Sequence, residues 1–152
     1  MTPATPTATN EIDVLNDVTK TLIDSHKGYE TCVEATDDSY SLQSNFQERA
    51  LRRADLIKEF QAQVQTLGGT PSTVGSVAGA AHRAWTSFTT IFADDEKAAI
   101  EAIDDGEEFL AEKIEGALND EALSPRTREL LQKAHADARE GERFADALDK
   151  AL

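Results

Sequence analysis

The fold is decided by one stretch, residues 42–71, which reads LQSNFQERALRRADLIKEFQAQVQTLGGTP. Along it one row of mostly apolar side chains recurs at steps of three and four, the period of one face of an α-helix. The row consists of Leu42, Phe46, Ala50, Arg53, Ile57, Phe60, Val64 and Leu67. Gly68 and Gly69 end the pattern as C-terminal glycines do, and Pro71 prevents the helix from resuming. We therefore expect a helix over residues 40–67, about 40 Å long at 1.5 Å per residue.

A second helical pattern lies directly before this one, over residues 11–36. Asn10 is the N-cap that we expect for it, because a short polar side chain there accepts from the first free N–H groups. The short link between residues 11–36 and 40–67 predicts an antiparallel hairpin. Residues 1–9, rich in Thr, Ala and Pro, are expected to be a disordered tail. The remaining residues, 10–152, are expected to form a single domain.

The second half of the chain repeats the arrangement over residues 95–118 and 125–150. Ser124 is suited to an N-cap and Pro125 to the first helical position, so the last helix has the clearest start. A shorter apolar pattern over residues 74–92 predicts an additional helix in the long crossover. Strand-like alternation occurs nowhere in the sequence. These patterns predict an all-α protein, a ferritin-like four-helix bundle of two antiparallel hairpins.

The composition restricts the classes of partner. The chain has 152 residues and a net charge of −14. A surface this acidic is unsuited to phosphate backbones and anionic lipid headgroups, so we expect neither nucleic-acid nor membrane binding. Residues 94–121 contain twelve Asp or Glu against two Lys. We interpret this run as a solvated helix face, with a weak divalent-cation or basic-partner surface as the alternative.

The cellular location is inferred from what the sequence lacks. No apolar run approaches transmembrane length, and residues 1–9 lack the basic and apolar regions of a signal peptide. The single cysteine, Cys32, leaves no partner for an internal disulfide. A cytoplasmic protein is the expectation, and a homodimer through the Ala-rich face of the last helix stays open.

Several short motifs resemble a bacterial family carried as domain of unknown function 2383. They are Ile12-Asp13-Val14-Leu15-Asn16, Gly28-Tyr29-Glu30, Leu67-Gly68-Gly69-Thr70-Pro71, and Gly75-Ser76 followed by Gly79, His82-Arg83 and Trp85. The resemblance covers roughly residues 11–150 and is most distinctive from Gly75 to Trp85. It implies a ferritin-like bundle and carries no established activity.

Three polar residues interrupt the apolar rows near mid-bundle: His26, Arg53 and Glu107. An unpaired buried charge is very costly, so we predict that Arg53 and Glu107 meet inside the bundle. His26, Tyr29 or Glu30 are expected nearby. Two readings stay open for this buried polar cluster. It either fixes the register of the helices or is a working or relic ligand site, unless the helices are rotated so that these residues are exposed.

Metal binding is the main rival hypothesis. Two-metal bundles of this architecture take a Glu from two helices and Glu-x-x-His from the other two, and Glu-x-x-His does not occur in this sequence. His26, Glu30 and Glu107 are the candidate ligands of an iron or manganese site. Arg53 argues against such a site, because its fixed positive charge repels a cation. We therefore expect no cofactor.

A second candidate region lies in the crossover. His82 and Arg83 precede Trp85 and would line a groove between the crossover helix and the bundle. In the competing interpretation, Trp85 anchors the crossover to the core and fills that space. A pocket there would favour a small-molecule binding bundle.

Catalysis has no support among the motifs. Leu-Gly-Gly-Thr-Pro-Ser at residues 67–72 lacks the lysine and the preceding strand of a phosphate loop, and no zinc spacing or nucleophile–base pair occurs. The sequence thus favours a non-catalytic accessory protein that binds an unidentified protein partner. A di-iron or di-manganese carboxylate protein and a small-molecule binding bundle are the alternatives.

Overall fold

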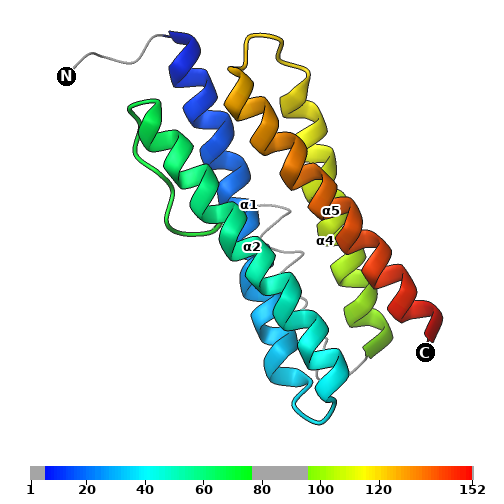
Figure 1. Cartoon of the computed structure of the whole chain (residues 1–152). Coiled ribbons are helices and arrows are strands. Elements are labelled where there is room, and N and C mark those ends of the chain that lie inside the picture. Colours follow the sequence, from blue (N-terminus) through cyan, green and yellow to red (C-terminus); the bar gives the residue numbers. More distant parts are fainter. Residues whose placement is uncertain (1–5, 77–95, 152) are drawn as a thin grey trace.

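The computed structural model describes residues 6–76 and 96–151, and these residues form a four-helix bundle (Figure 1). The helices are α1 (Pro6–Ala35), α2 (Tyr40–Thr66), α4 (Glu96–Leu118) and α5 (Pro125–Ala151). No strand occurs within the described ranges. The predicted all-α four-helix architecture is therefore confirmed.

The helices are arranged as two antiparallel hairpins, α1 with α2 and α4 with α5 (Figure 1). The α1–α2 turn lies at the same end of the bundle as the first residues of α4 and the last residues of α5. α2 and α4 consequently run in the same direction, and α2 ends at the end of the bundle opposite to the one where α4 begins.

The glycines that end α2 do so for a visible reason. Gly68 adopts φ = +87°, a left-handed conformation that a residue without Cβ adopts at little cost. The N–H of Gly69 then bonds the carbonyl of Val64 at 2.9 Å. A Cβ atom on Gly69 would lie 2.7 Å from Cγ2 of Ile12, so α1 packs directly on this turn.

Two expected helix starts differ from the structure. α1 begins at Pro6, so Asn10 is not its N-cap; the Asn10 amide instead donates to Asp120 at 2.9 Å. Proline suits a first helical position, which allows the helix to begin inside the segment expected to be disordered. Residues 74–76, where the crossover helix was expected to start, are not helical. The additional helix is thus not confirmed, and the rest of residues 74–92 lies outside the described residues.

The interior contains two separate groups of apolar side chains. The first, here called the Leu130 cluster, lies toward the α4–α5 turn and includes Leu22, Phe60, Ile114, Leu130 and Ala134. The second, called the Phe46 cluster, lies toward the α1–α2 turn and comprises Tyr29, Cys32, Phe46, Ala50, Ala99, Ile100, Ile103 and Ala145. Each cluster takes side chains from all four helices, so both hold the two hairpins together.

Among the described helices, none is long and apolar enough to span a lipid bilayer.

Candidate functional site

Arg53 of α2 lies at the centre of the bundle with no solvent exposure. Its Nη1 donates to Oε1 of Glu107 at 2.7 Å, and its Nη2 donates to the other oxygen of the same carboxylate. Nε donates to Oδ2 of Asp137 at 2.7 Å, and Nη1 also donates to Oγ of Ser25 at 3.0 Å. One guanidinium thereby joins all four described helices, and the predicted Arg53–Glu107 contact is present.

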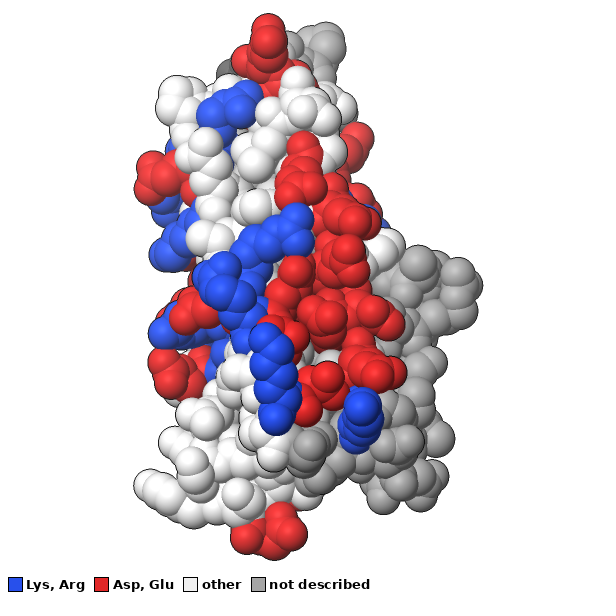
Figure 2. All heavy atoms as spheres, turned by 90° about the vertical axis from the view of Figure 1, so that its right-hand side faces the viewer, with Lys and Arg blue, Asp and Glu red and all other residues white. Residues whose placement is uncertain are grey.

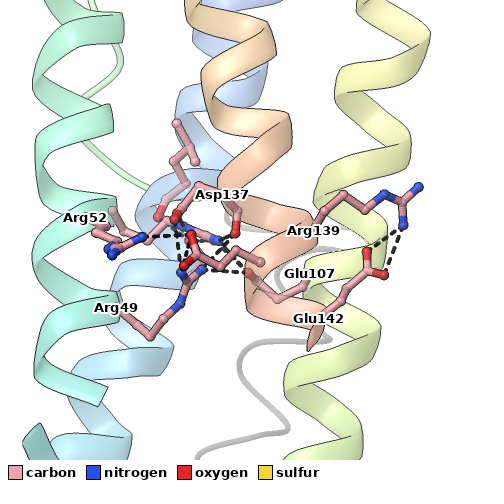
Figure 3. A network of polar contacts seen from close by, with 10 residues as sticks. Arg49, Arg52, Glu107, Asp137, Arg139 and Glu142 are labelled. Atoms are coloured by element: carbon pink, nitrogen blue, oxygen red, sulfur yellow. Dashed lines mark hydrogen bonds and ion pairs between the residues drawn. The ribbon is translucent and has the colours of Figure 1, made fainter. Parts of the chain in front are cut away.

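Arg49 lies one helical turn before Arg53 and binds the same two carboxylates (Figure 3). It donates to Oδ1 of Asp137 at 3.0 Å and to Oε2 of Glu107 at 3.3 Å. It also donates to the backbone carbonyl of Asp137 at 2.9 Å. We call Arg49, Arg53, Glu107 and Asp137 the charged layer. Its two cations and two anions cancel, which is what a low-dielectric interior requires.

The layer depends on close approach of α4 to α5 at Gly141. A Cβ atom at this position would lie 1.7 Å from Oε2 of Glu107 and 2.8 Å from Nη2 of Arg49. Gly141 is one turn after Asp137 on the same buried face of α5. The missing side chain therefore provides the space in which Glu107 meets both arginines.

Tyr29 of α1 closes the layer on the side of the Phe46 cluster. The guanidinium carbons of Arg49 and Arg53 lie 5.6 Å and 5.7 Å from the centre of its ring, within cation–π range. The Tyr29 ring also packs near the Phe46 ring, with 6.3 Å between centroids. Tyr29 thus connects the charged layer to the Phe46 cluster.

The protonation states follow from burial and from the neighbouring charges. Burial lowers the pKa of Arg53, but Glu107 and its other neighbours outweigh this effect, so its pKa is raised and it stays charged. Burial raises the pKa of Asp137, but Arg53 and Arg49 outweigh it and hold that pKa below its usual value. For Glu107, burial has the larger effect and raises the pKa, while Arg53 and Arg49 act in the opposite direction.

Not all predicted members join the cluster. His26 lies at the rim, with its side chain 28% exposed, and its Nδ1 is 2.8 Å from Oε1 of the exposed Glu30. The inward position on this turn of α1 belongs to Ser25, which is fully buried and contacts Arg53. The expectation that His26 belongs to the buried cluster is therefore wrong, because the helix phase places its neighbour inside.

Two members of the layer, Arg49 and Asp137, were not predicted from the sequence. Arg49 is four residues from Arg53, and Asp137 is four residues from Gly141. In both cases helical spacing places the pair on one face. The signal that could have found Asp137 is its position three residues after Ala134 and four before Gly141, which places it on the buried face of the last helix.

The outer edge of the layer opens into a groove of about 290 Å³ between α2 and α5. Its lining residues are Arg52, Asp55, Leu56, Lys133, Ala136, Asp137 and Glu140. Arg52 bonds Glu140 at 2.7 Å at one end, and Lys133 bonds Glu59 at 2.9 Å at the other. The predicted groove at His82, Arg83 and Trp85 lies outside the described residues.

The donor chemistry of the layer does not fit a two-metal centre. A guanidinium has no lone pair to offer and repels a cation, and every carboxylate oxygen of Glu107 and Asp137 already accepts from an arginine. Within residues 6–76 and 96–151, no three His, Cys, Asp or Glu side chains are placed to hold a metal ion. The layer can tie helices together, but it offers no free base, acid or ligand.

The fold and the charged layer together define the class of protein. It is an all-α four-helix bundle whose interior contains a charged layer of matched cations and anions. The family model described as a domain of unknown function, DUF2383, matches residues 10–120. This is more than half of the chain, which therefore belongs to the DUF2383 family. The matched range contains Arg49, Arg53 and Glu107, whereas Asp137 lies beyond it. No curated protein matches the chain.

Proposed function

We propose that the chain is a non-catalytic accessory protein of the cytoplasm, a ferritin-like bundle without a core metal that acts through its surface. The observation that supports this proposal is that every carboxylate oxygen of Glu107 and Asp137 accepts a hydrogen bond from an arginine. A general acid needs a transferable proton and a general base a free lone pair, each within reach of substrate, and arginine does not give up its proton in proteins. Arg53 and Glu107 are fully buried and Arg49 and Asp137 nearly so, with their charges matched internally. This supports a structural role for the interior.

The partner that we propose is a protein with a basic surface. Acidic side chains form a continuous area on the face built by α4 and α5 (Figure 2). Asp104, Glu108, Glu142 and Asp146 belong to this area, since each lies close enough to another to raise a pKa within it. Opposite charge on a partner would speed association and select against acidic competitors.

The metal content of the protein tests the interior part of the proposal. Untagged protein is purified from cells grown with ample iron and manganese, without chelators, and its metals are measured by elemental analysis. We expect only trace metal. Near-stoichiometric iron or manganese would overturn the proposal and favour the di-metal alternative. In that case the variant Glu107→Gln shows whether the layer supplies a ligand.

Cross-linking in cells tests the surface part. The variant Asp104→Asn/Asp146→Asn removes two charges from the α4–α5 face, and the control Asp13→Asn/Glu30→Gln removes two exposed charges from α1. We expect the first variant to lose cross-links to a basic partner and the control to keep them. Equal cross-linking in all three proteins would contradict the proposed binding face.

A further inference from the structure

The groove between the antiparallel helices α2 and α5 has an ion pair at each end (Figure 1). Arg52 of α2 bonds Glu140 of α5 at 2.7 Å, and Lys133 of α5 bonds Glu59 of α2 at 2.9 Å. On each helix the two residues are two turns apart, which corresponds to about 10 Å. Between these two ion pairs lie the other lining residues, Asp55, Leu56, Ala136 and Asp137.

The floor of the groove is apolar. Leu56 is only 3% exposed, and Ala136 is half-buried beside it on the facing helix. The carboxylate of Asp137 also borders the groove, but its two oxygens accept from Arg49 and Arg53. The floor can therefore contact a hydrocarbon chain, and Asp137 is not free to bind a ligand.

Both basic residues of the groove are already paired within the protein. Arg52 bonds Glu48 at 2.9 Å in addition to Glu140. The ammonium group of Lys133 donates to both oxygens of Glu59, each at 2.9 Å. An anionic ligand would have to compete with these carboxylates, so the groove is poorly suited to one.

Asp55 is the charged lining residue that lacks a counter-charge. Its side chain is exposed, and within residues 6–76 and 96–151 it has no hydrogen bond or ion pair. The charged layer is neutral as a whole, although its Arg49 also lies 3.9 Å from Glu140. Outside the layer, the charged residues that line the groove or pair with its lining are four acids and two bases: Glu48, Asp55, Glu59, Glu140, Arg52 and Lys133. A positively charged ligand would therefore complement the groove.

From the apolar floor and the unpaired acid beside it, we propose that the groove is a binding site for a small primary alkylamine. The ammonium group pairs with Asp55, and the alkyl chain lies on Leu56 and Ala136 between the two ion pairs. The groove volume of about 290 Å³ is at the lower end for small-molecule sites, which restricts the ligand to a short chain. This site is independent of the proposed function, whose partner binds the α4–α5 face.

Titration of the full-length, ¹⁵N-labelled protein with n-hexylamine at neutral pH tests the proposal through the amide chemical shifts. Ionic strength is held at about 0.15 M, where the attraction of a cation by distant charges is largely screened. We expect saturable shifts centred on Asp55, Leu56 and Ala136. Shifts that do not saturate, or that lie mainly on the acidic α4–α5 face, would overturn the proposal.

Chain length tests the apolar floor. Each fully buried methylene strengthens binding by up to about fourfold. Because the groove is open on one side, we expect a gain of about tenfold from ethylamine to n-hexylamine. Equal affinities for the two amines would show that only the charge is bound and would overturn the proposal. Hexanoate, which has a similar chain and the opposite charge, is expected to give no saturable shift.

Variants test the two parts of the site. Asp55→Asn should weaken n-hexylamine binding severalfold, as expected for loss of an exposed ion pair. Asp13→Asn removes an exposed acid from α1 and should leave the affinity unchanged. Ala136→Leu places a larger apolar side chain in the groove and should abolish saturable binding. Equal weakening by Asp55→Asn and Asp13→Asn would show that only net charge matters, which would overturn the proposal.

A last comparison separates a free amine from a lysine side chain, since both carry an alkylammonium group. The probe is lysine blocked at its amino and carboxyl groups, titrated under the same conditions. We expect it to bind more weakly than n-hexylamine, because its backbone amides do not fit the apolar floor. Tighter binding of the blocked lysine would assign the groove to a side chain of a protein partner and would overturn the small-molecule assignment.

Discussion

Gly141 provides the space that the carboxylate of Glu107 occupies. A Cβ atom at position 141 would be only 1.7 Å from Oε2 of Glu107, far inside contact distance. Both residues are on buried faces of neighbouring helices, and the Glu107 carboxylate cannot move away without breaking a bond to Arg49 or Arg53. The geometry of the charged layer thus requires that position 141 carry no side chain.

The first prediction concerns this glycine. Alanine is favoured over glycine inside a helix by about 1 kcal/mol, so on propensity alone Gly141→Ala would stabilise the protein. The overlap of the new Cβ atom with Glu107 outweighs this gain. We therefore expect the free energy of unfolding to fall by about 1–3 kcal/mol. Gly116→Ala is the matched control, because its Cβ would meet no atom within 4 Å. Urea denaturation measures both; stabilisation by Gly141→Ala would refute the overlap argument.

The second prediction concerns the charge of Glu107. Glu107→Gln keeps the shape but leaves two buried guanidiniums with one carboxylate, and breaking a buried pair in this way costs about 3–5 kcal/mol. The exposed Glu112 of the same helix is the control, and Glu112→Gln is expected to stay within about 0.5 kcal/mol of wild type. The measurement is the free energy of unfolding at pH 7. Equal losses from the two variants would contradict a charged layer.

The third prediction concerns pH. The pKa of Asp137 is lower in the folded protein than its ordinary value of about 3.9. Its stabilising contribution is therefore fully present above about pH 4 and is lost as the pH falls through the folded pKa. We expect the difference in unfolding free energy between wild type and Asp137→Asn to be largest near pH 7 and to narrow below about pH 4. A difference that stays constant from pH 7 to pH 3 would show that Asp137 is not stabilised as an anion.

The fourth prediction concerns the end of the bundle at the α4–α5 turn. The buried carboxylate of Glu11 accepts from the Ser124 N–H, from the Ser124 hydroxyl at 2.9 Å and from the Thr127 hydroxyl at 3.0 Å. Glu11→Ala leaves these donors without their acceptor, at an expected cost of about 1–3 kcal/mol. Thermal unfolding should show a clear fall in melting temperature. Asp13→Ala, on the exposed side of α1, should have little effect, and a similar fall there would point to helix propensity instead.

Helix positions were predictable because local chemistry sets them. α2 ends where glycine can adopt a left-handed turn, and α5 begins at the proline that follows Ser124. The Arg53–Glu107 contact was also predictable, since each charge lies in an otherwise apolar row and needs a partner. The start of α1 was not, because a Thr- and Ala-containing segment is weakly committed to any structure, and Pro6 can begin a helix earlier than Asn10.

The rest of the layer depends on helix rotation and separation, which a single sequence does not determine. Ser25 and His26 are adjacent and fit the same apolar row about equally well, yet a rotation of part of a turn decides that Ser25 points inward. Asp137 and Ala138 present the same ambiguity on α5. The side chain of Arg49 is long enough to reach the charged layer. The distance between α2 and α5 therefore decides which groups it binds.

The shared bonding of Arg49 and Arg53 has a consequence for how this protein can change over generations. Glu107 and Asp137 each bind both arginines, so losing any one member leaves an unmatched charge in the buried interior. An all-apolar replacement of the whole set is compatible with a stable bundle, but each single step toward it passes through a less stable protein. We therefore expect substitutions at these four positions to occur in compensating pairs, so that related proteins either keep or replace the four residues together.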